Sequence, residues 1–458
     1  MTVLEQMGEW TSAAGESPLG DAARELLALH LLDTVGAWVA GGKTEDGAAL
    51  SRASSSPSSS LPLLSEGPLD RIVAGVGTTR LTEIDDIHMP SCTTPGAVVA
   101  PTALLVAARL ERRDAGTFAS ALRAGYEVMT HLGVAVRGPE ILARGIWPTY
   151  LAAPVAAAAV TGRLLGLDPG RIADALAMAL TRISGGPGRP PSPSPRWLLL
   201  GLAARAGCEA ALAAASGYAG DRKLLDDDWL ARTHGLACDR AALAAPDEGR
   251  FGIGAVSIKH YCAAKQTIAA IDAFRELLGQ GITPDRIAAL RVAVPGAVVK
   301  MIGHRRAVAG RVERITSAPY HLALAAYRPE DLDDVARPNL ANEPAIAAFM
   351  DRVEVAADPD LDRHYPERWP ARVEAVLDSG ERVSKLVLDA RGDPGRPADA
   401  SEIRKKFRRL AEPVIGETAA HDLEQKCLAA TRDDKALASL CTMVNAWPPR
   451  TTSRPVES

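Results

Sequence analysis

The amino-acid sequence predicts a mainly helical protein in which a smaller α+β domain is inserted into an all-helical domain. Apolar residues recur at three- and four-residue intervals through most of the first half, as in amphipathic helices. Strand-like alternation begins only after about residue 259, and a helical pattern returns near the C-terminus. We therefore expect a helical domain at 1–258, an α+β domain at 259–399 and a helical return at 400–458.

The first clear helix is predicted from Asp21 to Ala40, because leucines and valines repeat along one face and two glycines follow. The stretch 51–68 is rich in serine and proline, which predicts a surface loop. The proline-rich stretch 185–196 is expected to interrupt the helices and to cross a surface or a cleft. Further helices are predicted at 101–112, 115–136, 149–167, 168–183 and 196–216.

In the central part, a helix at 263–278 is followed by alternating apolar and polar residues at 287–295, which predict a half-buried strand. Two further strands, at 372–377 and 382–388, flank the Asp-Ser-Gly sequence at 378–380 and predict a hairpin. The segment 402–447 is helical in pattern. This order supports an inserted domain, because the last helices can return to the first domain.

Composition excludes several classes of protein. The 458-residue chain has 52 basic and 56 acidic side chains and a net charge of -4, so it lacks the excess positive charge of a nucleic-acid binder. Its six cysteines lack the spacing of a zinc site or a redox loop, which favours reduced thiols in the cytoplasm. The N-terminus lacks a basic region before an apolar run, and the apolar stretch 149–168 is largely alanine, so neither a signal peptide nor a membrane span is expected.

The densest group of polar side chains lies in TEIDDIHMPSCTTPGAVVAP at 82–101 and contains Glu83, Asp85, Asp86 and His88. Three carboxylates and an imidazole within six residues cannot all face apolar surroundings. Together they can hold a proton donor or acceptor whose pKa is shifted toward neutrality. The alternative is a solvated acidic loop that caps the next helix. The sequence contains no phosphate loop, nucleophile elbow or metal-spaced histidine pair that competes with this group.

At this point the chain resembles the MmgE/PrpD family, which includes 2-methylcitrate dehydratase, cis-aconitate decarboxylase and iminodisuccinate epimerase. The matching strings follow in the order LLDTVGAWVAGG, DDIH with TPGAVVAPTALL, GYEV, RGIWPTY, SIKHYCAAKQTIAAIDAF and SAPYHLALAAY. The resemblance implies a homodimer in which each subunit has a helical domain and an α+β lid. It implies an active site between that domain and the lid, which needs no cofactor and no metal. It also implies proton abstraction next to a carboxylate of a small organic acid.

The resemblance implies a set of site residues as well. The positions that match the family's functional positions are Glu83, Thr94, Trp147, Arg196, Lys259 and Tyr320. Family members usually have histidines where this chain has Thr94 and Trp147, and a lysine where it has Arg196. Threonine is no general base near neutral pH, and tryptophan offers an apolar wall with one N–H donor. A standard aconitate-like cycle is therefore in doubt, and we expect a changed substrate.

We expect Lys259 or His88 to take the proton and Tyr320 or Lys259 to return one. Arg196, which cannot be deprotonated, and Arg144 are expected to anchor a substrate carboxylate. The sequence leaves open that Lys259 is a surface lysine, that Tyr320 only packs, and that His88 is inherited scaffold.

Two further points concern Arg144 and the two aspartates. Arg144 could pair with an acidic residue instead of binding substrate. Asp85 and Asp86 are expected to accept backbone N–H bonds, with at most one of them reaching the substrate.

The function predicted from the sequence is a cytoplasmic lyase, of dehydratase or decarboxylase type, acting on a small carboxylic acid without a cofactor. An isomerase, epimerase or cyclase of a specialised pathway is the alternative, since such a reaction needs one acid and one base but no leaving group. A catalytically inactive dimeric binding protein is the hypothesis from another class, motivated by the two replaced histidines.

Overall fold

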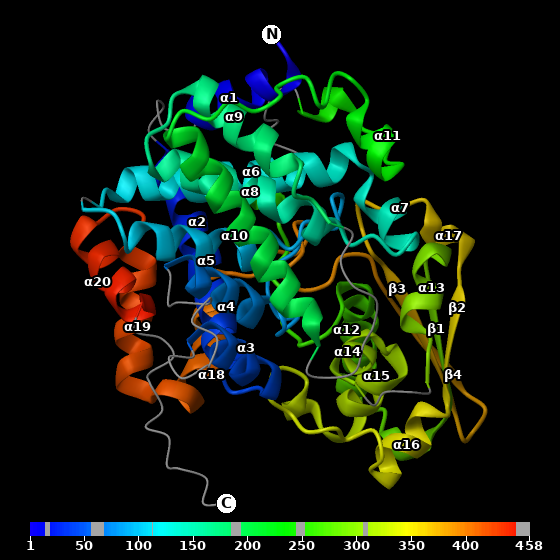
Figure 1. Cartoon of the computed structure of the whole chain (residues 1–458). Helices are drawn as coiled ribbons and strands as arrows, with labels where there is room; N and C mark the ends of the chain where they lie inside the picture. Colours follow the sequence, from blue (N-terminus) through cyan, green and yellow to red (C-terminus); the bar gives the residue numbers. More distant parts are fainter. Residues whose placement is uncertain are drawn as a thin grey trace, which may run out of the picture.

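The first half of the chain consists of helices that pack on one another (Figure 1). The computed structural model describes residues 1–13, 19–55, 68–111, 113–184, 194–243, 252–305 and 310–445. The helices of the first half are α1 (Val3–Ala13), α2 (Asp21–Gly41), α3 (Glu45–Ser55), α4 (Pro68–Arg80), α5 (Pro95–Ala107), α6 (Ala115–Ala135), α7 (Gly138–Ala143), α8 (Pro148–Leu164), α9 (Pro169–Leu180), α10 (Pro195–Ala215) and α11 (Trp229–His234).

The middle of the chain combines short helices with a four-stranded sheet of order β2-β1-β3-β4. The strand β1 pairs in parallel with β2 and antiparallel with β3, and β3 and β4 form an antiparallel hairpin. The helix α12 packs against β3 and β4, and α15 packs against β2. The elements are α12 (Lys265–Gly279), β1 (Ile287–Val294), α13 (Gly296–Ile302), α14 (Arg311–Thr316), α15 (Ala318–Tyr327), α16 (Pro344–Met350), β2 (Val353–Ala357), α17 (Pro359–Asp362), β3 (Ala371–Leu377) and β4 (Arg382–Val387).

Three C-terminal helices return to the first half of the chain: α18 (Ala400–Ile415), α19 (Glu417–Ala429) and α20 (Asp434–Asn445). Both α18 and α19 pack against α2, and α20 packs against α5 (Figure 1). The start of α18 is fixed by a capping box, in which Asp399 accepts from the Glu402 N–H at 2.8 Å and Glu402 accepts from the Asp399 N–H at 3.1 Å.

The buried apolar side chains form two large clusters. One draws on residues between 3 and 258 together with residues between 403 and 444, and the other draws on residues between 261 and 390. The protein is therefore mainly helical with a small sheet, as the sequence predicts. The domain bounds 1–258, 259–399 and 400–458 stay a prediction.

Elements with clear local signals are confirmed. The helix α2 covers the predicted 21–40, and α6 covers nearly all of 115–136. The helices predicted at 149–167, 168–183, 196–216 and 263–278 are α8, α9, α10 and α12, each within a few residues. The predicted strand and hairpin are β1, β3 and β4, with Gly380 at φ 82° in the turn. The helical segment predicted at 402–447 is α18 to α20, and residues 446–458 lie outside the described part.

Several boundaries were predicted wrongly. The helix predicted at 101–112 is α5, which already begins at Pro95 and contains Pro101 in its interior. The stretch 51–68 is helical at both ends, because α3 continues to Ser55 and α4 begins at Pro68; residues 56–67 lie outside the described part. The interruption predicted at 185–196 ends early, because α10 starts at Pro195. Residues 185–193 also lie outside the described part of the chain.

The helix α10 has the length and apolar composition of a membrane-spanning helix. In this fold it packs against α4, α8 and α9, and its first turn buries the charged side chain of Arg196. These contacts are those of a core helix.

We expect the packing of α10 on α8 to depend on Gly207. A Cβ atom at this position would press on the carbonyl oxygen of Pro154, so Gly207→Ala should lower the free energy of unfolding by roughly 1–3 kcal/mol. The control is Gly162→Ala on α8, where the added Cβ would make an ordinary contact with Leu167 at 3.5 Å, so the helix should keep or gain stability. Chemical denaturation measures both variants, and equal stabilities would contradict the prediction.

Candidate active site

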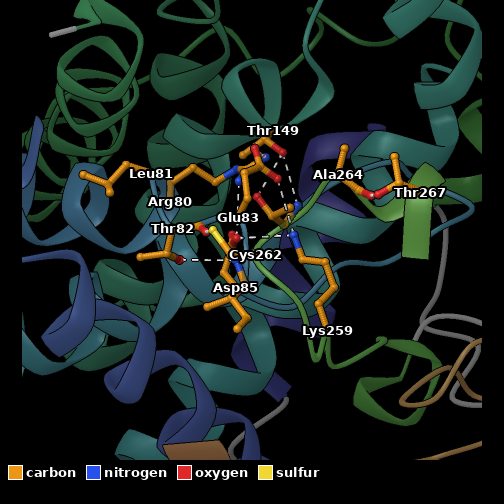
Figure 2. Close-up of polar contacts among 12 residues, drawn as sticks. Arg80, Leu81, Thr82, Glu83, Asp85, Thr149, Lys259, Cys262, Ala264 and Thr267 are labelled. Atoms are coloured by element: carbon orange, nitrogen blue, oxygen red, sulfur yellow. Dashed lines mark hydrogen bonds and ion pairs between the residues drawn. The ribbon is translucent and has the colours of Figure 1, made fainter. Parts of the chain in front are cut away.

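The site is built around a buried group of four charged side chains. Arg80 ends α4, Glu83 and Asp85 follow in the next turn, and Lys259 lies just before α12; each is at least 94% buried. The Lys259 Nζ atom lies 3.5 Å from Glu83 Oε2 and 3.5 Å from Asp85 Oδ1. Arg80 approaches from the other side, 2.7 Å from Glu83 and 3.3 Å from Asp85 (Figure 2). We call these four residues the ion cluster.

An antiparallel bridge explains why residues so distant in sequence meet. The Ile87 N–H donates to the Ser257 carbonyl at 2.9 Å, and the Ser257 N–H donates to the Ile87 carbonyl at 2.8 Å. Asp85 lies two residues before Ile87, and Lys259 lies two residues after Ser257. Antiparallel pairing sets such residues opposite each other on one face, which brings the carboxylate to the ammonium.

The backbone of Glu83 adopts a left-handed conformation with φ 56°. This region is uncommon for a residue with a Cβ atom, and such residues gather at functional sites. The turn lets the side chains of Glu83 and Asp85 converge on the same ammonium, while Ile84 between them is buried among apolar neighbours.

The two carboxylates differ in their affinity for protons. Burial raises the pKa of Asp85 to about 6, although Arg80 and Lys259 act in the opposite direction. Burial also acts to raise the pKa of Glu83, but Arg80 and Lys259 outweigh it and hold that pKa below its usual value. Near neutral pH, Glu83 is therefore a fixed anion, whereas Asp85 can exchange a proton.

Arg196 adds a further cation beside the ion cluster. It lies in the first turn of α10, is fully buried, and contributes to the lowered pKa of Glu83. Its guanidinium carbon lies 3.8 Å from the ring centre of Trp147, the residue that precedes α8. Tyr150 donates a hydrogen bond to the Arg196 carbonyl oxygen at 2.5 Å. The stacking on Trp147 fixes the plane of the guanidinium.

Thr94 is held by a second threonine. Its N–H donates to Thr149 Oγ1 at 3.1 Å, and the two hydroxyl oxygens lie 3.2 Å apart. Thr94 thus links the start of α5 to the start of α8 and presents no ionisable group.

Two polar atoms that border Arg80 are buried without a hydrogen-bond partner among the described residues. They are Asp85 Oδ2 and the indole Nε1 of Trp197, whose ring centre lies 6.0 Å from the Arg80 guanidinium carbon. Leaving a buried acceptor and a buried donor unpaired costs free energy. A small polar ligand beside Arg80 could donate a hydrogen bond to the carboxylate oxygen and accept one from the indole N–H.

The structure places Asp86 on the opposite side of the chain from Asp85. Its carboxylate accepts from the Gly96 N–H at 2.8 Å and from the Tyr126 hydroxyl at 2.7 Å, and lies 3.0 Å from His30 Nδ1. These three contacts tie α2, α5 and α6 together. Asp86 therefore serves the packing of the helices and does not join the ion cluster.

His88 is also fully buried, and its Nδ1 atom lies 2.9 Å from the hydroxyl of Ser91. Its backbone N–H donates to the Thr93 carbonyl at 2.8 Å, which closes the turn before α5. These contacts place His88 in the framework of this turn.

Arg144 and Tyr320, two other residues singled out from the sequence, lie outside the ion cluster. Arg144 is exposed after α7 and donates to the Gly235 carbonyl at 3.2 Å. Tyr320 is buried in α15, where its hydroxyl accepts from the Leu340 N–H at 3.4 Å. The structure thus brings together Glu83, Lys259 and Arg196, with Asp85, and binds Tyr320 into the core of the mixed region.

Sequence reasoning missed Arg80, Thr149 and Trp197. The spacing of Arg80 three residues before Glu83 is the signal that could have identified the first, because such pairs face each other on a helix or in a tight turn. Within the described residues, no group of three or more histidine, cysteine, aspartate or glutamate side chains is placed to hold a metal ion.

Comparison with known proteins identifies the family of this chain. The profile of the MmgE/PrpD N-terminal domain matches residues 5–235, and that of the MmgE/PrpD C-terminal domain matches residues 261–430. A curated relative, the cis-aconitate decarboxylase-like protein oryM of Aspergillus oryzae, is 25% identical over 392 residues, covering 79% of this chain and 80% of the relative. The resemblance stated from the sequence motifs is confirmed, and the chain belongs to the MmgE/PrpD family.

Proposed function

We propose that this protein is a lyase that acts without a cofactor on a small carboxylic acid, by proton transfer at the carbon next to a carboxylate. The family and the decarboxylase-like relative support an enzyme of this type. The observation that carries the proposal is the contact of Lys259 with two buried carboxylates, one of which has a pKa near 6. A proton-transfer group works best when its pKa lies near the working pH.

The charge of the site suits an anionic substrate. Arg80, Arg196 and Lys259 carry three positive charges when ionised, and Glu83 and Asp85 carry two negative charges, which leaves one positive charge in excess. A substrate carboxylate would complete the balance. Electrostatic stabilisation by fixed cations is strong where water is excluded, so the same cations would stabilise charge that develops next to that carboxylate.

We propose the following proton movements. In a dehydration, Asp85 as carboxylate or Lys259 as amine takes the proton from the α carbon. The C–H electrons form the double bond as the C–O bond to the β hydroxyl breaks. That hydroxyl takes a proton from the other member of the pair, the Lys259 ammonium when Asp85 is the base or the Asp85 carboxyl when Lys259 is the base, and departs as water. In a decarboxylation, the C–C bond breaks, carbon dioxide leaves, and the electron pair on carbon takes a proton from the Lys259 ammonium. In both, Arg196 holds the neighbouring carboxylate.

We also propose that residues 259–399 act as a lid over the ion cluster and that the active protein is a cytoplasmic homodimer. Two contacts support the lid. Lys259 comes from the start of this segment, and Arg311 in α14 donates to the Leu81 carbonyl at 2.8 Å, two residues before Glu83. Movement of the segment would therefore open and rebuild the site.

An isomerase or epimerase is the second candidate function, and the surroundings of Thr94 and Trp147 favour it. The Thr94 hydroxyl lies against Thr149, and the Trp147 ring lies against Arg196, so neither supplies an acid for a leaving group. An epimerase needs no such acid, because the proton returns to the same carbon.

We expect Lys259→Ala to lower kcat/KM by roughly 100- to 10,000-fold, because it removes the proposed proton carrier. Exchange of the α hydrogen of candidate acids with solvent deuterium should fall in parallel. The matched control is Lys265→Ala, which also removes a fully buried lysine paired with an aspartate, Asp393 at 2.5 Å, outside the ion cluster. Full turnover by Lys259→Ala would show that the proposed proton carrier is wrong.

The same exchange experiment separates the candidate functions in the wild-type protein. A lyase releases water or carbon dioxide together with deuterium exchange, whereas an epimerase exchanges deuterium without releasing either. A binding protein without activity does neither, although it still binds the acid.

We expect kcat/KM to rise with pH through about 6 and then level off. Below that pH the Asp85 carboxyl is protonated and can neither accept a proton nor pair with the Lys259 ammonium. Because Glu83 and Asp85 interact, the apparent pKa belongs to the pair. Asp85→Asn should abolish this acid limb, and Glu83→Gln should shift it to lower pH, since the charge of Glu83 raises the pKa of Asp85. A limb unchanged in both variants rules out this assignment.

We expect small carboxylates to stabilise the folded protein. A ligand at 100 times its dissociation constant adds about 2.7 kcal/mol to the free energy of unfolding, which a thermal melt detects. Arg196→Met should remove this effect. Arg205→Met is the control, because Arg205 lies on the same helix but pairs with Asp70 and Glu209 at the surface. Equal stabilisation of both variants by the same acid would exclude Arg196 from the binding site.

A further inference from the structure

We propose that Lys406 is a positioning residue for the ion cluster, which holds the peptide between Glu83 and Asp85 and adds its charge to the field at Asp85. This inference rests on the proposed function, because it assigns Lys406 a part in the same proton transfer. Lys406 does not itself contact the proposed reacting groups, and it acts through the backbone and through charge.

The contacts of Lys406 are few and short. The side chain reaches from α18 into the core and is 99% buried. Its Nζ atom donates to the Ile84 carbonyl oxygen at 2.7 Å and lies 2.5 Å from Asp33 Oδ1 on α2. Removing an ammonium from water costs several kcal/mol, and these two partners compensate for the loss. A buried lysine is therefore fixed at the carbonyl between the two carboxylates.

The close approach of α18 to α2 makes these contacts possible. Gly36 lies one turn after Asp33, and Phe407 follows Lys406 in sequence. A Cβ atom at Gly36 would lie 3.0 Å from Phe407 Cδ2, which is a tight contact, so the glycine lets α18 lie close to α2. With glycine at this position, Lys406 reaches Asp33 and the Ile84 carbonyl at the same time.

The hydrogen bond to Ile84 acts where the backbone needs support. Glu83 has φ 56°, a conformation that persists only when the surroundings enforce it. The Ile84 carbonyl belongs to the peptide that leads to Asp85, and its bond to Lys406 fixes the plane of that peptide. Since Glu83 and Asp85 flank Ile84, this bond helps to keep both side chains directed at Lys259.

The charge of Lys406 also acts on its neighbours. Burial lowers the pKa of Lys406, while Asp33 opposes this effect; Lys259 lowers the pKa further and Asp85 raises it. By reciprocity the ammonium of Lys406 lowers the pKa of Asp85. On the other side, burial and then Lys406 lower the pKa of His260 to about 3, so this imidazole stays neutral. The groups that face Lys406 are thus Asp33, Asp85, Lys259 and His260.

The test is a titration of carboxyl carbons by NMR in protein with carbon-13-labelled aspartate. The Asp85 signal is identified by its loss in Asp85→Asn. Lys406→Met should raise the titration midpoint of Asp85 by on the order of one pH unit, and Lys406→Arg, which keeps the charge, should leave it nearly unchanged. The acid limb of kcat/KM should move upward with the midpoint in Lys406→Met. An unchanged midpoint in this variant overturns the proposal.

Two further variants keep the result interpretable. Lys406→Gln retains a donor for the Ile84 carbonyl without the charge, and replaces Lys406→Met if that protein does not fold; the same upward shift is expected. Glu424→Gln is the structural control, because Glu424 of α19 is buried and pairs with Arg404 and Arg408 of α18, the helix that carries Lys406. It should lower Tm but not move the Asp85 midpoint, and a shift equal to that of Lys406→Met would assign the effect to general loosening of α18.

The titration needs no turnover. If the wild-type protein exchanges deuterium into no acid, the proposed function fails while the Asp85 midpoints still decide the role of Lys406. If exchange occurs and the midpoint stays fixed in Lys406→Met and Lys406→Gln, the positioning role fails while the proposed function stands.

Discussion

The structure depends on the neutralisation of charge inside a helical core. Glu83 and Asp85 are buried, and taking two carboxylates out of water costs several kcal/mol each unless cations meet them. Arg80 and Lys259 each form ion pairs with both carboxylates. The end of α4, the turn after it and the segment before α12 must therefore come together before these ion pairs can offset the cost of desolvation. The same requirement that closes the fold at this point also assembles the groups proposed to move a proton.

The acidic segment shows how adjacent residues acquire different tasks. Asp85 turns toward Lys259, and Asp86 turns toward Gly96, Tyr126 and His30. Asp86 binds the helices around the turn, which holds the turn in place for Asp85. The division allows a strained and highly charged segment to be stable although only one face of it serves chemistry.

The sequence predicted those features whose causes are local. The period of apolar residues located α2 and α6, and the Asp-Ser-Gly sequence that ends at Gly380 located the hairpin. Lys259 and Glu83 were found through family motifs. The helices α3 and α4 were missed because a serine- and proline-rich stretch separates them, and the short strand β2 is ordered by pairing with β1.

Residues whose role depends on distant partners could not be found in this way. Lys406 lies in a run of basic residues on an amphipathic helix, where a lysine is usually solvated, and its partner Ile84 is 322 residues away. Only packing of α18 on α2 reveals that this one side chain points inward. Tyr320 is the opposite case, because the motif indicated a site residue and the structure shows its buried hydroxyl accepting from the Leu340 amide, so its role in catalysis stays a prediction.

In the proposed function, the Arg196–Trp147 pair would restrict which acids the site accepts. Arg196 cannot lose its charge, and the indole 3.8 Å from its guanidinium carbon covers one face of that group. The edge of the guanidinium is the part that a carboxylate binds with two parallel hydrogen bonds, in the plane of the group. With one positive charge in excess over the five charged groups, one buried carboxylate completes the balance, and a second would enter uncompensated. The remainder of the substrate would then meet the indole and the Thr94–Thr149 pair, which accommodate a less polar skeleton better than a further anion.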